Sequence, residues 1–343
     1  MKTLFIPTVA GMMLWAAMTL TEATFNDTPT LQAAQNTYTF TLIAEFRPPG
    51  LEPSILAEGP VITNDGTVVY SAGLGGFVAS SIFSGDGTVT RLLVPLFSHA
   101  FTPLVTGVSG NGMMVTNGIF PRDIIDVHDG RVVGQLNPGD GFFVGSGVED
   151  FYDVSINNRG SVAFTGSVVD ECSFGSVPNG GVFRFDGKTT TTIAKFGSPA
   201  DIFTVIAFPS INERGQVAFL VNPLQNFCPS TPGIEAGDLY VGDGTSLMKI
   251  AEAFTAPSLN NRGEVGFIGM TGGALSILVS DGTKTRIVAD TNGPFADFPQ
   301  SFLVRAGISL NDPGNVAFMA ILDDGNLGIF TGPDVVKDKV IAT

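Results

Sequence analysis

Apolar residues along this chain fall into short runs, separated by turns rich in glycine, asparagine and aspartate. The clearest turn lies in a phrase, Ser-Ile-Asn-Asn-Arg-Gly-Ser-Val-Ala-Phe at 155–164, which returns with small changes at 210–219, 258–267 and 309–318. Weaker copies surround Gly66 and Gly112, so six copies recur at a spacing of about fifty residues. A repeat of this period predicts one supersecondary unit copied around or along an axis.

Each unit carries a second signal downstream of the phrase. An Asp-Gly pair follows another apolar run at Asp86-Gly87, Asp129-Gly130, Asp186-Gly187, Asp243-Gly244 and Asp281-Gly282. This pair is typical of a β-hairpin whose turn needs a positive φ. One unit therefore predicts four short strands, joined in order by the Asn-x-x-Gly turn, a variable loop and the Asp-Gly turn. No stretch after residue 37 has a helical period.

Four-stranded units of this size, repeated radially, are typical of a β-propeller. We predict an all-β fold, a β-propeller of six four-stranded blades over residues 38–343, after a flexible segment at 24–37. Ring closure leaves an alternative open, because Thr41–Phe46 and Lys339–Thr343 both have the pattern of a fourth strand. Either one blade has five strands, or a seventh, incomplete blade is present.

The asparagine of the phrase has a structural interpretation. Asn157, Asn212, Asn260 and Asn311 align with Thr63 and Ser109, and these residue types share the ability to hydrogen-bond the backbone two residues on. We interpret the position as a turn former rather than a ligand. The phenylalanines that end the four clear copies, at 164, 219, 267 and 318, are interpreted as core residues, and the small residues before them as points of close approach between blades.

Alternating strands place the two kinds of tight turn on one face and the longer, variable connections on the other, where function is usually found. The variable connections carry carboxylates and an aromatic residue that form the candidate binding face: Asp140, Glu149, Asp150, Tyr152, Asp153, Asp170, Glu171 and Asp201. Carboxylates among aromatics suit a carbohydrate or a cationic group. Their oxygens also suit Ca²⁺, and no other cofactor is expected. Solvated loops with no ligand are the alternative.

The net charge of −15 excludes the basic surface that a nucleic-acid-binding protein needs. Known catalytic motifs are also missing: there is no G-x-S-x-G elbow, no Walker A loop, no dinucleotide fingerprint and no EF-hand spacing. His99 and His128 are the two histidines, and we place them on opposite faces, which argues against a histidine-based metal centre. No catalytic residue and no metal ligand is assigned.

The first residues have the pattern of a secretory signal peptide, with Lys2, an apolar run at 4–20 and small residues before a cleavage point after Ala23. An uncleaved anchor is the alternative, since the run approaches the length of a membrane span. No second apolar run follows, so no membrane span is expected in the mature chain. Cys172 and Cys228 follow the turn glycines of adjacent units at similar distances, which predicts a disulfide in an exported protein; two buried thiols are the alternative.

The phrase Asn-x-x-Gly-x-Val-Ala-Phe, complete at 157–164 and 212–219, resembles that of bacterial tandem-repeat exported proteins of the NxxGxxAF, choice-of-anchor type. More distantly, the blade pattern is similar to TolB-like six-bladed propellers. The first resemblance implies export, and therefore a secreted, periplasmic or cell-surface protein whose activity is uncharacterised. This chain lacks the C-terminal anchor of that family, which puts surface attachment in doubt.

Two functions follow as hypotheses. The first is a binding or interaction scaffold that uses the variable face to hold an unknown protein or carbohydrate ligand. The second is a carboxylate-dependent polysaccharide hydrolase or lyase, since paired carboxylates are the groups such reactions use. The sequence alone does not fix the separation of the carboxylates, and both hypotheses remain open at this point.

Overall fold

The structure of the chain is a computed structural model. It describes residues 6–7, 40–41, 61–73, 80–94, 107–115, 122–136, 154–166, 180–196, 204–223, 236–299 and 308–342. All regular elements in these ranges are β-strands. Within the same ranges, no helix is long and apolar enough to cross a bilayer.

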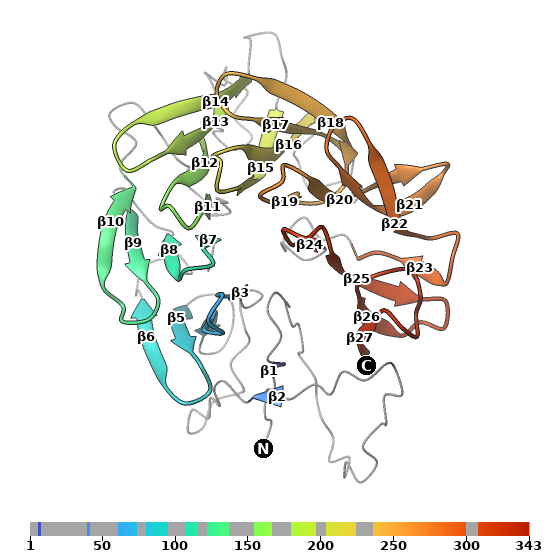
Figure 1. Cartoon of the computed structure of the whole chain (residues 1–343), viewed down its shortest axis with the longest axis horizontal. Coiled ribbons are helices and arrows are strands. Elements are labelled where there is room, and N and C mark those ends of the chain that lie inside the picture. The colour runs from blue at the N-terminus through green and yellow to red at the C-terminus, as the bar shows by residue number, and fades with distance from the viewer. Residues whose placement is uncertain are drawn as a thin grey trace.

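Six antiparallel sheets lie in a ring, which confirms the predicted six-bladed β-propeller (Figure 1). The first blade has β3 (Val61–Ile62), β4 (Val68–Gly73), β5 (Ser80–Gly85) and β6 (Thr90–Val94). The second has β7 (Gly107–Val108), β8 (Met113–Val115), β9 (Arg122–Asp126) and β10 (Val132–Leu136). The third has β11 (Val154–Ile156), β12 (Val162–Gly166), β13 (Gly180–Phe185) and β14 (Thr190–Phe196).

The fourth blade has β15 (Thr204–Ile211), β16 (Val217–Pro223), β17 (Gly237–Gly242) and β18 (Leu247–Ala253). The fifth has β19 (Ser258–Leu259), β20 (Val265–Thr271), β21 (Ala274–Ser280) and β22 (Thr285–Asp290). The sixth has β23 (Phe295–Asp297), β24 (Ile308–Leu310), β25 (Val316–Leu322), β26 (Leu327–Phe330) and β27 (Lys339–Ala342). Each of the first five blades is a meander in chain order, with its first strand nearest the axis and its fourth at the rim (Figure 1).

The closure alternative resolves as a five-stranded last blade. β23 and β24 pair with opposite ends of β25, and β27 forms the fourth strand of the blade. Thr41 does not join this blade as predicted; it belongs to β2 (Phe40–Thr41), which pairs with β1 (Ile6–Pro7). Residues 42–46 lie outside the described ranges. The domain boundaries at 23 and 37 stay predictions.

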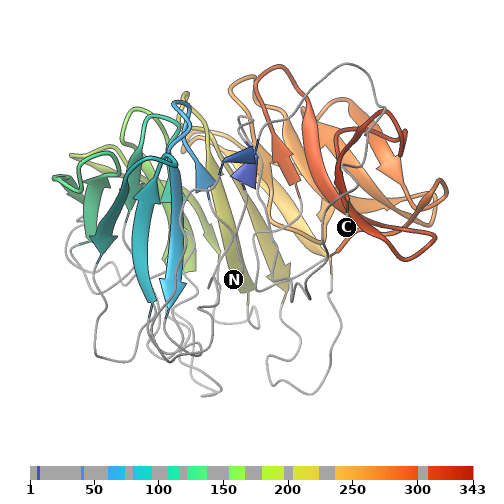
Figure 2. The same ribbon diagram turned by 90° about the horizontal axis from the view of Figure 1, so that it is seen from below.

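The glycines of both kinds of turn adopt positive φ, as their positions in the repeat predict. Gly66, Gly112, Gly160, Gly215, Gly263 and Gly314 do so between first and second strands, and Gly87, Gly130, Gly187, Gly244 and Gly282 between third and fourth strands. All these turns lie at one end of the blades, which we call the turn face; the opposite end is the loop face (Figure 2, turn face uppermost). This arrangement confirms the predicted separation of the two kinds of connection.

The core lies between blades. Phe164, Phe219, Phe267 and Phe318 of the repeated phrase are buried, as predicted. Phe164 stacks on Phe183 and Phe219 on Tyr240, in each case its register partner on the third strand. A Cβ on Gly266 would lie 2.9 Å from Ile308 Cγ2 of the next blade, so the small residue of the phrase does mark a close approach.

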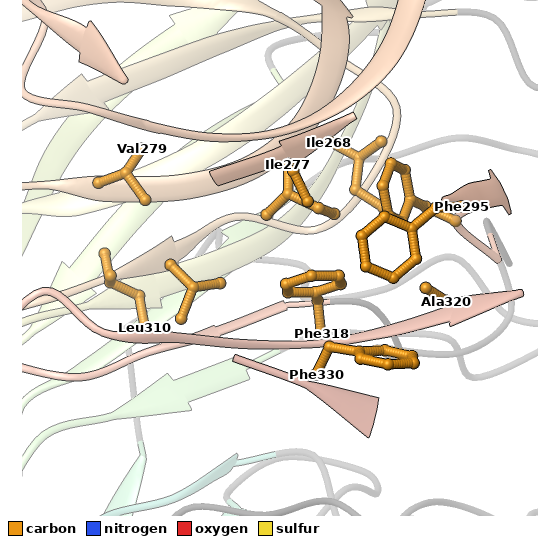
Figure 3. Packing of buried hydrophobic residues seen from close by; sticks show 11 residues of the cluster. Ile268, Ile277, Val279, Phe295, Leu310, Phe318, Ala320 and Phe330 are labelled. Carbon is orange, nitrogen blue, oxygen red and sulfur yellow. The ribbon is translucent and has the colours of Figure 1, made fainter. Parts of the chain in front are cut away.

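The largest aromatic group joins the fifth and sixth blades (Figure 3). Phe295, Phe298, Phe318 and Phe330 pack together and against Ile268 and Ile277 of the fifth blade. Phe295 belongs to β23, the strand that makes this blade five-stranded. The extra strand therefore contributes a core residue.

Candidate functional site

The asparagine of the phrase caps its own turn. Asn157 Oδ1 accepts hydrogen bonds from the backbone N–H groups of Arg159 and Ser161, both at 3.0 Å. Asn212 and Asn260 make the same pair of bonds. This confirms the interpretation of the position as a turn former, and the side chain is buried in all three copies.

The other half of the amide crosses to the next blade. Asn157 Nδ2 donates to the carbonyl oxygen of Asn212 at 2.9 Å, and Asn212 Nδ2 donates to that of Asn260 at 3.1 Å. Asn260 Nδ2 continues the series to Asn311 at 3.1 Å. The series links the third, fourth, fifth and sixth blades close to the axis.

Two flanking positions add parallel rows of cross-blade bonds. The serine two residues before each asparagine accepts a backbone N–H from the next blade: Ser155 from Ile211 at 3.3 Å, Ser210 from Leu259 at 3.1 Å and Ser258 from Leu310 at 2.9 Å. The residue after each asparagine donates its N–H to a side chain of the next blade: Asn158 to Glu213, Glu213 to Asn261 and Asn261 to Asp312, at 2.8–2.9 Å. We call the three rows the turn ladder.

Sequence reasoning missed this second role. Its signal was the constancy of serine two positions before asparagine, because an isolated turn needs no particular residue there. The serine and the asparagine of the phrase are used in joining blades, which supports a structural role for these two positions.

The aspartates of the Asp-Gly hairpins are also engaged. Asp86, Asp186, Asp243 and Asp281 each accept two backbone N–H groups and a threonine or serine hydroxyl of their own turn. The Thr88 hydroxyl, followed by backbone N–H groups, lowers the pKa of Asp86 to about 2, and Thr283 with the same kind of support lowers that of Asp281 to about 2. These carboxylates shape turns.

One cluster on the turn face differs from the repeat. His128, in the hairpin of the second blade, places Nδ1 2.7 Å from Asp126 Oδ1 and Nε2 2.8 Å from Asp65 Oδ2 of the first blade. The ring lies over Gly112, where a Cβ would overlap the imidazole. Glycine is therefore required there both for its positive φ and for the close approach.

The three groups of this cluster shift one another's proton affinity. Partial burial lowers the pKa of His128, but the hydrogen bonds and charges of Asp126 and Asp65 outweigh burial, so the pKa is raised above 6.5. The Thr63 hydroxyl, with the Thr67 N–H and His128, lowers the pKa of Asp65 to about 2. The charged imidazole donates to both carboxylates; the neutral ring donates to one and presents a lone pair to the other.

We expect the cluster to make stability depend on pH. Because the pKa of His128 is raised on folding, its contribution is fully present below about pH 6.5 and is lost as pH rises through the folded pKa. His128 and its two carboxylate partners are partly exposed, so the loss of stability is about 1 kcal/mol or less. Urea unfolding at several pH values between 5 and 9 measures it, as the difference between the wild-type chain and His128→Gln.

The matched control is His99→Gln, which removes the other histidine and should keep the wild-type pH dependence. Asp65→Asn should weaken the dependence as His128→Gln does, since the cross-blade carboxylate is a cause of the raised pKa. A dependence on pH that survives in His128→Gln would contradict the assignment.

The predicted binding residues lie outside the described residues: Asp140, Glu149, Asp150, Tyr152, Asp153, Asp170, Glu171 and Asp201. The same holds for Cys172 and Cys228. The segments that carry them start or end at strand termini on the loop face: Leu136, Val154, Gly166, Gly180, Phe196, Thr204, Pro223 and Gly237. Their convergence, the disulfide and a calcium site stay predictions.

The second-to-third connections of the last two blades are described, and there the prediction of a long connection is wrong. β20 and β21 are joined by Gly272 and Gly273 alone, and β25 and β26 by the short turn 323–326. In the part of the chain that the structure describes, no group of His, Cys, Asp and Glu side chains is arranged to hold a metal ion.

Comparisons with known proteins support the fold and leave the activity open. Residues 100–251 match a family of unknown function, DUF7453, over less than half of the chain. No curated protein matches the chain. Prolyl oligopeptidase B from Galerina marginata, solved with a 25mer macrocyclization substrate, is 11% identical with a TM-score of 0.53, over 82% of this chain and 43% of that one.

Two further solved structures match more weakly. Acylaminoacyl peptidase from Pyrococcus horikoshii has a TM-score of 0.47 and 10% identity, over 90% of this chain and 46% of that one. TolB from Agrobacterium tumefaciens has a TM-score of 0.38 and 17% identity, over 63% and 74%. The chain thus spans less than half the length of the two peptidases, and the likeness concerns the propeller fold.

Proposed function

We propose that this chain is an exported binding scaffold, whose ligand is held by the loop face of the second, third and fourth blades. Export rests on the apolar run at 4–20 and on the resemblance to exported repeat proteins. The ligand class is carbohydrate, because the segments at this face combine carboxylates with phenylalanine and tyrosine.

The turn ladder is the observation that carries the proposal. In the ladder, the repeated polar groups join neighbouring blades. The connections that differ in sequence between units lie on the opposite face. Residues 137–153, 167–179 and 224–236 are the long connections of three consecutive blades, and each leaves and re-enters the fold at that face. Variable segments on a rigid scaffold are the usual location of binding residues.

The test is a binding screen followed by substitution. The full chain is screened against a panel of polysaccharides, and affinity for the best of them is measured by calorimetry. Tyr152→Ala and the double variant Asp150→Asn, Asp153→Asn should each weaken binding at least about tenfold. Asp243→Asn, a hairpin carboxylate of the turn face, is the matched control and should leave affinity unchanged.

The products of the same incubations separate binding from catalysis. Intact polysaccharide supports a scaffold. New reducing ends or unsaturated sugars that disappear in the Asp150, Asp153 double variant would replace it by the carboxylate-dependent hydrolase or lyase. Binding to no polysaccharide, or equal loss of affinity in Asp243→Asn, would contradict the proposal.

A further inference from the structure

The sequence contains four Asn-Gly pairs, at 111–112, 117–118, 179–180 and 292–293. An asparagine followed by glycine is the pair most prone to deamidation, because glycine has no Cβ to hinder attack of its nitrogen on the asparagine side chain. The structure describes both residues of the first and the last pair. Asn111 and Asn292 are both exposed, so water reaches each of them. The two pairs differ in the hydrogen bonds that hold them.

Asn111 lies in the first turn of the second blade and is held by its neighbours. Its Oδ1 accepts from the Ser109 hydroxyl at 2.6 Å, and its Nδ2 donates to the carbonyl oxygen of Asn158 in the third blade at 2.8 Å. The Gly112 N–H donates to the carbonyl oxygen of Ser109 at 3.0 Å. Deamidation removes Nδ2 and needs a deprotonated glycine nitrogen, so at Asn111 it breaks the hydrogen bonds that both groups make.

Asn292 lies in the turn 291–294, which joins β22 to β23, and its side chain is not held in this way. Its backbone N–H donates to Asp290 Oδ1 at 3.0 Å, but its side-chain amide has no hydrogen-bond partner among the described residues. The Gly293 nitrogen lies 3.4 Å from the Asp290 carbonyl oxygen, beyond the usual range for an N–H···O bond. The amide can therefore approach the Gly293 nitrogen without losing a side-chain bond to the described part of the chain.

We propose that Asn292 is a site of spontaneous deamidation in the folded protein, whereas the hydrogen bonds of Asn111 protect it. The Gly293 nitrogen loses its proton to solvent and attacks Cγ of Asn292, and Nδ2 takes up a proton and leaves as ammonia. The product is a cyclic succinimide, which water then opens. Hydrolysis of the Cγ–N bond gives aspartate, and hydrolysis of the bond from the main-chain carbonyl carbon to the same nitrogen gives isoaspartate. Water is the only other reactant.

Isoaspartate at position 292 changes the main chain next to a core strand. The chain then runs through Cβ and Cγ of the residue, which lengthens the path from Asp290, the end of β22, to Phe295, the start of β23. Phe295 pairs with Leu322 and lies in the aromatic group that joins the last two blades. Both ends of the turn belong to sheets, so we expect the longer path to weaken the pairing of β23. The aspartate product only adds a negative charge.

The experiment follows each Asn-Gly pair by peptide mapping and mass spectrometry, on the folded full chain kept in mildly alkaline buffer. Asn292 should deamidate at least about tenfold faster than Asn111. The same measurement in urea is the control for local sequence, and there the two rates should become similar, because unfolding removes the hydrogen bonds of Asn111. An Asn292 that stays intact in the folded chain, or an Asn111 that reacts no faster in urea, would overturn the proposal.

Gly293→Ala is the matched variant. A Cβ at this position would lie 3.6 Å from the Asp290 carbonyl oxygen, which is an ordinary contact, and Gly293 has no positive φ, so the fold should be retained. The methyl group hinders the attack of the nitrogen, and deamidation of Asn292 should slow at least about tenfold. Equal rates in this variant and in the wild type would contradict the mechanism.

The aged protein tests the consequence for β23. Its isoaspartate form, separated by chromatography, should unfold at a lower urea concentration than Asn292→Asp, which carries the same charge without the longer main chain. Unfolding of both at the same urea concentration would contradict the effect on the strand.

Discussion

Asn212→Ala is expected to lower the free energy of unfolding by roughly 3 kcal/mol, at about 1 kcal/mol for each buried hydrogen bond lost. Asn212 is buried and accepts from the N–H groups of Arg214 and Gln216 at 3.0 Å. Its Nδ2 donates across the blades to the carbonyl of Asn260. Alanine leaves these backbone groups without hydrogen-bond partners, and because the site is buried, water does not easily replace the lost bonds. Urea unfolding, monitored by far-ultraviolet circular dichroism, measures the loss of stability.

Two variants test this expectation: one changes an exposed copy of the position, and the other changes only the donor half of the amide. Asn311→Ala removes the same repeat position in the sixth blade, where the residue is exposed and bonds to Asn315 N, so a loss below about 1 kcal/mol is expected. Asn212→Asp keeps the turn-capping oxygen and replaces the cross-blade donor by an acceptor. If Asn212→Asp were as stable as the wild type, the cross-blade bond would contribute nothing and the turn alone would explain the residue.

Phe295→Ala is expected to cost roughly 4 kcal/mol, within the range for a large aromatic side chain removed from a packed core. The ring has no exposed surface, and its centroid lies 5.6 Å from that of Phe298, 5.7 Å from Phe318 and 5.1 Å from Phe330. Its contacts with Phe318 and Phe330 are edge-on (Figure 3). Equilibrium urea unfolding measures the cost.

The control for Phe295 is Met270→Ala in the adjoining fifth blade. Met270 is 52% exposed at the end of β20, so its removal should change stability by less than about 0.5 kcal/mol. Equal losses in the two variants would mean that β23 is not a structural part of the sixth blade. A smaller loss for Phe295→Ala than for Met270→Ala would contradict the packing described for this cluster.

Much of the fold could be predicted, because the same turn-forming and apolar positions recur in six units of the sequence. Gly160 and Gly187 take the positive φ that their turns require, and Phe164 is buried where the phrase places it. β23 could not be predicted in this way. Phe295 follows a turn that occurs once, and its strand pairs at the far end of β25 from the repeated first strand.

The sites were harder to predict, because they depend on contacts between units. The cap made by Asn157 joins residues two and four apart and leaves a local pattern, whereas its bond to Asn212 spans 55 positions. His128 and Asp65 are 63 positions apart, and no other Asp-Gly pair of the repeat has a histidine before it. Only the placement of the hairpin on the turn face was accessible from the sequence.

The row of the turn ladder that the asparagine side chains form has a consequence for how such a chain can change over generations. Each rung runs from an asparagine side chain to a main-chain oxygen, a group that every residue of the neighbouring unit possesses whatever its side chain. A unit inserted by gene duplication would thus find a main-chain acceptor in the next unit. The unit that supplies the acceptor could change its side chains without losing the hydrogen bond that it accepts. Blade number and blade sequence are to that extent free to evolve separately.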